Sequence, residues 1–415
     1  MTRALALIDG EHYAPVVRAA LEELPYEFVA AHLVGGTEKL RDDSDYGVVL
    51  AEDLDRALSE HRPELVVDLS DEPVLGPKER FRLASRVLAA GFPYVGADFR
   101  FDPPELQAFP LPSIGVIGTG KRVGKTAITA HAARLYARDR KVVVVAMGRG
   151  GPPEPEVAKV APDIDALLEL SRSGRHAASD YLETAALAGV ETVGCRRCGG
   201  GLAGSVSISN VHQGAKLAVE LAPDLVLFDG SGAAIPPIET SRRVLVVNAA
   251  TDRDVATGYL NGFRHLVSDL VVLTMAEEGS GWEELRDAAA ELAPRVLATT
   301  LRPHPAEPVE GRTVAFFSTA PESAHELLAA HLRDEHGADV VHVSGNLSDR
   351  RTLVEELEHV EADVFLVELK AAAIDVVAEA ARERGVDIVL AGSDVISVDG
   401  QDLDAELLRL AEEAA

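Results

Sequence analysis

Residues 118–126 read GTGKRVGKT and bring together the residue types that bind a polyphosphate. In a P-loop, glycines let backbone N–H groups turn toward phosphate oxygens, a Lys reaches the β- and γ-phosphates, and a Ser or Thr hydroxyl binds Mg²⁺. Gly124, Lys125 and Thr126 supply the end of this pattern, between an apolar strand-like run and a helical stretch. We therefore predict a nucleoside-triphosphate site. Its expected residues are Gly118, Thr119, Gly120, Lys121, Arg122, Val123, Gly124, Lys125 and Thr126.

The start of this loop departs from the usual spacing. The pattern GxxxxGK[ST] would place its first glycine at position 119, whereas the glycine stands one residue earlier, at Gly118. The looser form GTxxxVGKT resembles the loop of dethiobiotin synthetase and its relatives, which are ATP-dependent enzymes that activate acids. Lys121 and Arg122 add positive charge at the mouth of the loop. The resemblance implies that the nucleotide is ATP.

Two other classes of P-loop protein fit the sequence less well. A guanine-nucleotide switch normally carries an NKxD-type motif, but Asn248 and Asp252 stand at the wrong spacing and without the Lys. A partitioning ATPase usually places a signature Lys five residues before the P-loop Lys, and here that position is Gly120. The pattern favours an ATP-dependent enzyme, and a non-enzymatic ATP-dependent switch is the alternative.

Metal-dependent phosphoryl transfer also needs a carboxylate near the γ-phosphate. Asp229 ends the apolar run 225–228 and opens DGSGAAIPP, so we expect it to bind Mg²⁺ together with Thr126. Glu154 and Glu156 follow another strand and are further candidates, and we include Glu154 among the expected metal ligands. The alternative for Asp229 is an Asp that caps a turn.

Two further loops combine glycine with arginine, MGRGGPPEPE at 147–156 and GCRRCGGGLAG at 194–204. Arg presents a planar fork suited to phosphate and carboxylate, and glycines let the backbone approach a ligand. In a chain of formal net charge -28, such loops indicate a small, strongly anionic substrate, which we expect Arg149, Arg196 and Arg197 to bind. The alternative for each loop is a surface loop with a solvated Arg.

Cys195, Cys198 and Lys370 are the other reactive side chains in or near these motifs. Two cysteines are too few for a disulfide framework and supply half of a usual zinc site, and the closest histidine, His212, follows no zinc pattern. We interpret both as structural thiols that flank the substrate-binding arginines. Lys370, in the otherwise apolar VELKAAA, is either a substrate ligand or a surface lysine with a buried stem.

The composition is that of a globular protein without affinity for polyanions. The chain has 415 residues, 47% of them hydrophobic and 26% charged, and its length predicts two or three domains. The net charge of -28 argues against nucleic-acid and membrane binding, since both surfaces are anionic. No apolar stretch reaches the roughly 20 residues of a membrane helix, and the N-terminus reads as a first strand. We expect a cytoplasmic protein.

Strands and helices alternate along the chain, which predicts the parallel α/β sheets that would position these loops. We expect an N-terminal Rossmann-like domain at 1–110, a P-loop NTPase α/β domain at 111–300 and a C-terminal α/β extension at 301–415. The Pro-containing segment 101–112 is the expected linker between the first two. The pattern leaves open whether the last part is a separate domain or extends the sheet before it.

The motifs taken together resemble those of one enzyme family. The segments GTGKRVGKT, VVVVAMGRGGPPEPE, YLETAALAGVETVGCRRCGGGLAG, DGSGAAIPP and VELKAAAIDVV are similar to cyclic 2,3-diphosphoglycerate synthetase, through most of the chain. The resemblance implies a ligase that converts ATP and 2,3-diphosphoglycerate into ADP, phosphate and cyclic 2,3-diphosphoglycerate. The alternative is another acid-activating ligase of the dethiobiotin synthetase type, which would keep the P-loop and change the acceptor.

On this basis we assign roles to the candidate residues. No protein nucleophile is needed, because the nucleophile belongs to the substrate. We also expect a homodimer. The expected catalytic residues are Lys125, Lys121, Arg122 and Arg149. The expected substrate ligands are Arg149, Arg196, Arg197 and Lys370, and the expected Mg²⁺ ligands are Thr126, Asp229 and Glu154.

Overall fold

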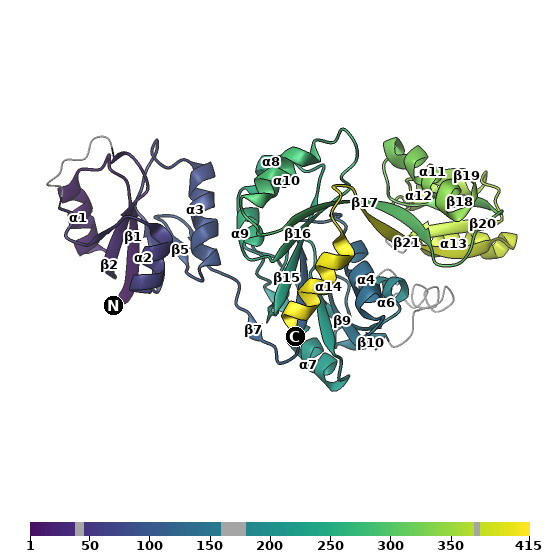
Figure 1. Cartoon of the computed structure of the whole chain (residues 1–415), viewed down its shortest axis with the longest axis horizontal. Helices are drawn as coiled ribbons and strands as arrows, with labels where there is room; N and C mark the ends of the chain where they lie inside the picture. Colours follow the sequence, from purple (N-terminus) through teal and green to yellow (C-terminus); the bar gives the residue numbers. More distant parts are fainter. Residues whose placement is uncertain (38–44, 159–179, 369–373) are drawn as a thin grey trace.

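The computed structural model describes residues 1–37, 45–158, 180–368 and 374–415 (Figure 1). These residues form an α/β fold with one sheet of 6 strands, one of 13, and a separate pair, β7 (Gln107–Ala108) with β14 (Ile238–Glu239). The predicted α/β class is thereby confirmed. Within the described ranges no helix is both long enough and apolar enough to cross a membrane.

The N-terminal sheet has the order β3-β2-β1-β4-β5-β6 and is parallel except for its last pair. Because side chains alternate along a strand, central strand β1 serves two cores. Leu5 and Leu7 pack with residues of α2 and α3, whereas Ala6 and Ile8 pack with residues of α1. The elements are β1 (Thr2–Ile8), α1 (Ala14–Glu23), β2 (Tyr26–Leu33), β3 (Leu50–Ala51), α2 (Leu54–His61), β4 (Leu65–Asp68), α3 (Pro77–Ala89), β5 (Tyr94–Val95) and β6 (Arg100–Phe101).

The larger sheet starts with the order β10-β11-β9-β13-β8-β15-β16-β17, and from β11 to β17 all neighbours run parallel. Every residue of β8, β13 and β16 is buried, which explains their uninterrupted apolar runs. The carboxyl ends of these parallel strands share one edge. The strands are β8 (Ser113–Gly118), β9 (Val142–Gly148), β10 (Glu156–Ala158), β11 (Glu191–Cys198), β13 (Leu225–Asp229), β15 (Arg242–Asn248), β16 (Leu270–Thr274) and β17 (Val296–Pro305), with β12 (Ile208–Ser209) beside β11.

Along the chain, helices alternate with the strands of this sheet, and in space they pack against it (Figure 1). Four short or medium helices start at an aspartate whose side chain accepts an N–H of the first turn: α2, α8, α12 and α14. The helices after β8 are α4 (Lys125–Tyr136), α6 (Asp180–Ala188), α7 (Val211–Glu220), α8 (Arg253–Thr257), α9 (Asn261–Leu266), α10 (Trp282–Ala290), α11 (His325–His336), α12 (Arg350–Leu357), α13 (Ile374–Arg384) and α14 (Leu403–Ala414).

The C-terminal strands extend the same sheet. β17 pairs with β16 through residues 296–298 and then with β21 (Asp387–Ser397), antiparallel, through residues 299–305. Beyond β21 the order continues with β20 (Val364–Glu368), β18 (Thr313–Phe317) and β19 (Asp339–Ser344). The final helix α14 returns to the P-loop part, where Leu407 and Leu410 join the core around α4 (Figure 1). The C-terminal residues are therefore joined to the P-loop part by one sheet and by one helix.

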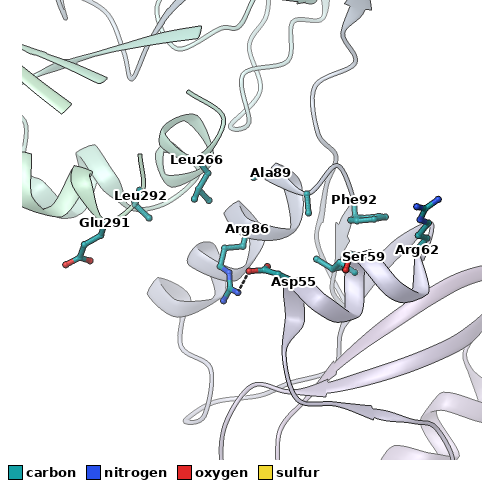
Figure 2. Close-up of a pocket in the computed structure, with 11 residues that line it drawn as sticks. Asp55, Ser59, Arg62, Arg86, Ala89, Phe92, Leu266, Glu291 and Leu292 are labelled. Atoms are coloured by element: carbon teal, nitrogen blue, oxygen red, sulfur yellow. Dashed lines mark hydrogen bonds and ion pairs between the residues drawn. The ribbon is translucent and has the colours of Figure 1, made fainter. Parts of the chain in front are cut away.

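The N-terminal sheet is attached to the larger one through α3 and α9. Lys78 Nζ lies 2.8 Å from Asp254 Oδ2, and Ser85 Oγ donates to the Tyr259 carbonyl at 3.0 Å. A groove between the two parts is lined by residues such as Arg86 and Leu266 (Figure 2). This groove lies beside the segments that lead into β16 and β17, at their amino ends, and therefore away from the phosphate-binding edge.

Buried His265 in α9 makes stability depend on pH. Its ring is fully buried, and Nε2 donates to the Ala256 carbonyl at 3.1 Å. Burial lowers the pKa of His265 from 6.5 to about 4. The unfolded chain therefore binds more protons between these two pH values, so the stability contributed by neutral His265 is complete above pH 6.5 and is lost as the pH falls toward 4. The full loss is about 3 kcal/mol, at about 1.4 kcal/mol per pKa unit.

Urea unfolding of wild type and His265→Gln at pH 7 and pH 4.5 measures this loss. Glutamine keeps a donor for the Ala256 carbonyl but does not titrate. We expect the variant to lose about 2 kcal/mol less than wild type between the two pH values, given roughly 1.4 kcal/mol per pKa unit. Equal losses in the two proteins would rule out His265 as the cause.

Candidate active site

The phosphate loop joins β8 to α4 and is held by close packing. A Cβ on Gly118 would lie 2.9 Å from the Val123 side chain and 3.0 Å from that of Lys125, so no other residue fits without a shift. Gly124 has a φ of 84°, a left-handed conformation that favours glycine. Thr274 Oγ1, from the end of β16, donates to the Val123 carbonyl at 2.8 Å. The turn is thus fixed by a hydrogen bond from β16, which is separated from β8 by β15.

The amino end of α4 is arranged to receive an anion. Unlike the aspartate-capped helices, α4 begins at Gly124, which has no side chain to cap the helix. Lys125 is half-buried, and its Nζ donates to the Gly120 carbonyl across the loop at 3.4 Å. A Cβ on Gly120 would meet nothing within 4 Å. The loop is therefore open at Gly120, where a phosphate can approach the backbone.

The acid predicted beside the phosphates stands on the neighbouring strand. Asp229 ends β13, pairs in register with Val116 of β8 and Ala146 of β9, and is 3% exposed. Thr126 lies in the first turn of α4 and is half-buried. Two oxygen-bearing side chains therefore lie at adjoining positions of the phosphate edge.

The two glutamates after β9 differ in position. Glu154 is exposed in the loop after β9. Glu156 starts β10, the outermost strand of this half of the sheet, and accepts a hydrogen bond from Tyr181 Oη at 3.2 Å. β10 is separated from β13 by β11 and β9, so Glu156 lies farther from Asp229 along the sheet than residues that follow β9.

Three predicted cationic residues meet at the turn after Asp229. Gly232 in this turn has a φ of 61°, and a Cβ there would lie 3.0 Å from Arg149 Nη2, 3.4 Å from Arg197 Nη2 and 3.9 Å from Lys121 Cγ. These side chains come from three separate segments: the P-loop, the loop after β9 and the end of β11. The fold therefore gathers two guanidinium groups and the aliphatic stem of Lys121 around one glycine at the phosphate edge.

Arg196 and Arg197 leave β11 differently. Arg197 is half-buried and donates to the carbonyls of Gly199 and Ser231, at 2.8 Å each, and to Ser231 Oγ at 3.2 Å. Arg196 is exposed, and successive side chains of a strand point to opposite faces. The structure thus brings Arg197 to the Gly232 turn and leaves the Arg196 side chain at the surface. Lys370 lies outside the described residues.

The arginine loops are held together by Asn210, which the sequence did not single out. Its Oδ1 accepts the backbone N–H of Arg196 at 2.7 Å, and its Nδ2 donates to the carbonyls of Pro152 and Pro153 at 3.2 Å each. Gly151 packs so closely on this strand that a Cβ would lie 2.0 Å from the Cys195 carbonyl oxygen. An asparagine just before a helix is usually a helix cap, so its position in the sequence does not indicate that it joins the two arginine loops.

The two cysteines, Cys195 and Cys198, differ in burial. Cys195 is buried against Gly214 of α7, where a Cβ would lie 2.2 Å from its Sγ, and burial raises the pKa of the thiol to about 12. Cys198 is exposed, and both cysteines are free. A buried thiol with so high a pKa is unreactive and serves packing.

Arg264 of α9 is a second residue that the sequence did not single out, and it is 2% exposed. It donates to the Ala233 carbonyl at 2.7 Å, to the Leu202 carbonyl at 3.0 Å and to the Leu260 carbonyl at 2.9 Å. Ala233 belongs to the turn after Asp229, and Leu202 to the glycine-rich loop after β11. One buried guanidinium therefore fixes both loops to the same helix.

Removing this guanidinium should be costly. Arg264→Ala removes a buried guanidinium and leaves the carbonyls of Leu202, Ala233 and Leu260 without this donor, so we expect the free energy of unfolding to fall by about 3 kcal/mol. Urea unfolding at pH 7 measures the change. The exposed Arg333→Ala serves as the control and should change stability by less than about 0.5 kcal/mol. A loss in Arg264→Ala as small as in the control would show that the two loops do not depend on Arg264.

The central parallel sheet, with a phosphate loop between β8 and α4 and an acid at the end of adjacent β13, defines a P-loop NTPase. The chain belongs to the cyclic 2,3-diphosphoglycerate synthetase family, and it is an enzyme. Family models for the N-terminal, P-loop and C-terminal domains of that synthetase match residues 3–102, 113–297 and 305–394. The resemblance drawn from the motifs is confirmed.

Named relatives cover the full chain. Cyclic 2,3-diphosphoglycerate synthetase of Rubrobacter xylanophilus is 50% identical over 434 residues, spanning 99% of this chain and 98% of the relative. The synthetase of Methanothermobacter thermautotrophicus is 40% identical over 447 residues, spanning 99% and 96%. A solved structure of LpxK from Aquifex aeolicus in complex with ATP is similar with a TM-score of 0.44 and 14% identity, over 80% of this chain and 95% of its own.

Proposed function

We propose that this enzyme uses ATP to close the intramolecular pyrophosphate of cyclic 2,3-diphosphoglycerate from 2,3-diphosphoglycerate, with release of ADP and phosphate. Family membership supports the reaction, and one structural observation carries its assignment to this site. Arg149, Arg197 and Lys121 surround Gly232, directly after the buried Asp229 and beside the phosphate loop. A substrate with two phosphates and a carboxylate needs such a set of cations, and a chain of net charge -28 places them here.

The proposed reaction has two steps, because two phosphates of one molecule do not join unaided. In the first, a substrate phosphate oxygen attacks the γ-phosphorus of ATP; the bond between this phosphorus and the β–γ bridging oxygen breaks, and ADP leaves. In the second, an oxygen of the other substrate phosphate attacks the substrate phosphorus that now carries the transferred group; the ring pyrophosphate bond forms, the bond between that phosphorus and the oxygen bridging to the transferred group breaks, and this group leaves as inorganic phosphate. Holding both groups in one molecule helps greatly, since effective molarities can reach about 10⁵ M or more.

The cationic residues at the phosphate edge would together neutralise the negative charge of the reacting phosphates in these steps. Lys125 and the loop N–H groups would hold the ATP phosphates, while Lys121 and Arg122 would lie between the γ-phosphate and the acceptor phosphate. Arg149, Arg196 and Arg197 would bind the substrate's phosphates and carboxylate. The position of Arg197 beside Ser231 supports its part in this assignment. Lys370 stays a proposed substrate ligand.

Mg²⁺ is the metal ion that we propose for the site. The donors fit it, because the Thr126 hydroxyl and the Asp229 carboxylate are hard oxygen ligands at adjoining positions, and Glu154 is a third candidate. When bound with ATP, the ion would neutralise phosphate charge. We also keep as predictions the domain bounds 1–110, 111–300 and 301–415, a homodimer and a cytoplasmic location.

An acceptor panel tests the proposed substrate against the rival reading, an acid-activating ligase of the dethiobiotin synthetase type. ADP release from Mg-ATP is measured with 2,3-diphosphoglycerate, 2-phosphoglycerate, 3-phosphoglycerate and unphosphorylated carboxylic acids. We expect the bisphosphorylated acid to give the highest rate, because it offers two phosphates to the cations beside Gly232. A higher rate with an unphosphorylated acid would favour the rival.

A further inference from the structure

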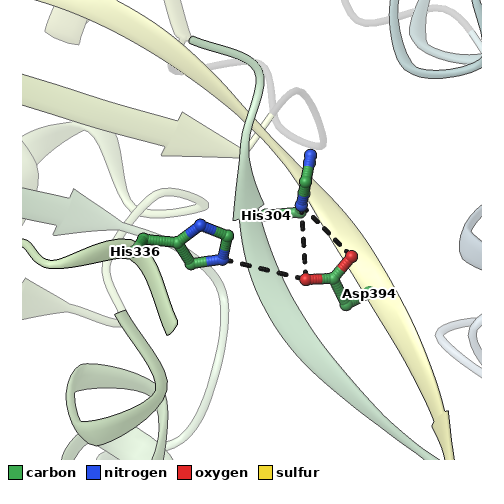
Figure 3. A group of neighbouring side chains, drawn as sticks. All are labelled: His304, His336 and Asp394. Atoms are coloured by element: carbon green, nitrogen blue, oxygen red, sulfur yellow. Dashed lines mark hydrogen bonds and ion pairs between the residues drawn. The ribbon is translucent and has the colours of Figure 1, made fainter. Parts of the chain in front are cut away.

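A cluster of three histidines and one aspartate lies away from the phosphate edge, where α11 meets the β17–β21 pair. His304 is on β17, Asp394 is on β21, and His331 and His336 are on α11. His304 pairs in register with Gly392, and Asp394 with Arg302, so the two side chains are diagonal neighbours on one face of the sheet. Figure 3 shows His304 and His336 directed at the Asp394 carboxylate from different elements.

The donor atoms surround the carboxylate at close but unequal distances. His304 Nδ1 lies 3.1 Å from Asp394 Oδ1, while His331 Nε2 and His336 Nε2 lie 3.6 Å and 3.8 Å from Oδ2. The last two distances are too long for hydrogen bonds. The ring centroids of His304 and His331 are each 5.4 Å from that of His336. The ligand atoms of His304, His336 and Asp394 all lie within 4.8 Å of one another, and His331 lies beside this group.

Two of these nitrogens lack the partner that burial normally requires. In the described part of the chain, His331 Nε2 and His336 Nε2 are buried and make no hydrogen bond. The side chains of His331 and His336 are 11% and 20% exposed. Buried polar atoms are usually paired, so this arrangement calls for a missing partner.

A metal ion satisfies all of these observations. In a tetrahedral zinc site with bonds of about 2.0–2.1 Å, ligand atoms lie about 3.3 Å apart, close to the separations of the three nitrogens from the carboxylate. Imidazole-rich sets suit Zn²⁺ and similar transition metals, whereas Mg²⁺ and Ca²⁺ prefer oxygen. Simple ion pairing explains the cluster less well, since it leaves both buried Nε2 atoms beyond hydrogen-bond distance of the carboxylate.

We propose that His304, His336 and Asp394 bind one divalent transition-metal ion of the zinc class, with His331 beside them. Three protein ligands would leave a fourth position for water. The ion would tie α11 to the strand pair that joins the P-loop part to the C-terminal strands. This inference is independent of the proposed reaction, because none of the four residues belongs to the phosphate edge.

Metal binding is measured on untagged, full-length protein stripped with EDTA and desalted. Apo-protein is titrated with ZnCl₂ alone, and zinc retained after gel filtration is counted by mass spectrometry. We expect one zinc per chain in wild type and a rise in melting temperature, since ligands that bind only the folded state stabilise it. Loss of a ligand should weaken binding at least tenfold in His336→Ala and in Asp394→Ala.

His359→Ala is the matched control, because this histidine is exposed and its Nδ1 lies 3.0 Å from the Glu355 carbonyl, within hydrogen-bond distance, in the same part of the chain. It should bind zinc as wild type does. Far-UV circular dichroism checks that each variant is folded, and a Co²⁺ titration of wild type reports a four-coordinate site by its visible absorption. The proposal would be overturned if the wild type retains no zinc. It would also be overturned if His359→Ala and Asp394→Ala lose zinc to the same extent.

Discussion

Lys125→Ala will lower the turnover of ATP with 2,3-diphosphoglycerate by about 10³-fold or more, the scale on which a positioned cation acts in phosphoryl transfer. Lys125 is the first residue of α4, and its ammonium group spans the loop to the Gly120 carbonyl at 3.4 Å. In the proposed complex, this group meets the β- and γ-phosphates. Because Lys125 is only half-buried, the fold should survive the change.

Steady-state ADP release at saturating ATP and substrate measures the loss. Lys216→Ala, an exposed lysine on α7, is the matched control and should keep near wild-type rates. Melting curves should show that both variants are folded. A Lys125→Ala enzyme with near-full activity would contradict the P-loop mechanism.

Arg149→Ala and Arg197→Ala will each reduce kcat/KM for 2,3-diphosphoglycerate by about 10- to 100-fold, as expected when one charge-assisted hydrogen bond is lost. Arg149 Nη2 and Arg197 Nη2 lie 3.0 Å and 3.4 Å from the position that a Cβ added to Gly232 would take, beside the phosphate edge. Affinity for ATP should change far less, because the P-loop holds the nucleotide independently of these two residues.

Binding of ATP and of 2,3-diphosphoglycerate is measured separately by calorimetry. Arg56→Ala, an exposed arginine on α2 of the N-terminal sheet, is the control. Arg197→Lys separates position from charge, because a lysine cannot span both the Gly199 and Ser231 carbonyls as the guanidinium does. Arg196→Ala, tested alongside, shows whether an exposed arginine of the same loop also contacts the substrate. Equal weakening of both ligands in Arg149→Ala and Arg197→Ala would count against the assignment.

The parts of this site that depend on local sequence could be predicted. The P-loop has glycine, lysine and threonine at fixed spacing, and Asp229 stands at the end of an apolar run. Strands β8, β13 and β16 are buried along their whole length and largely apolar, because helices cover both faces of a parallel sheet. The α/β class and the position of the phosphate edge follow from these signals.

The parts that depend on distant pairing could not be predicted. Which arginines meet at Gly232 is set by the pairing of β11 with β9 and by Arg264, whose partners lie 62 and 31 residues away. An arginine in a short helical stretch, such as Arg264, has the same local sequence whether its side chain is buried or solvated. The continuity of β17 from the P-loop part into the C-terminal strands could not be predicted either. It depends on one strand that pairs first with β16 and then with β21.

The histidine–aspartate cluster shows this limit most sharply. His331 and His336 share a helix, but His304 and Asp394 are separated by 90 residues and meet only because β17 and β21 are antiparallel neighbours. The H-x₄-H spacing of His331 and His336 occurs in zinc motifs, but no pair of cysteines accompanies it at these positions. The cysteine pair, which does have a motif-like spacing, instead has one thiol buried in packing and one exposed.

Phosphorus NMR of the enzyme with Mg-ATP and 2,3-diphosphoglycerate tests the central claim most directly. The proposed reaction predicts new pyrophosphate resonances from a cyclic product, with ADP and inorganic phosphate formed in equal amounts. Lys125→Ala under the same conditions should give none of these signals. If ATP is consumed without a cyclic pyrophosphate, or if no ATP is consumed, the proposed reaction is wrong for this chain.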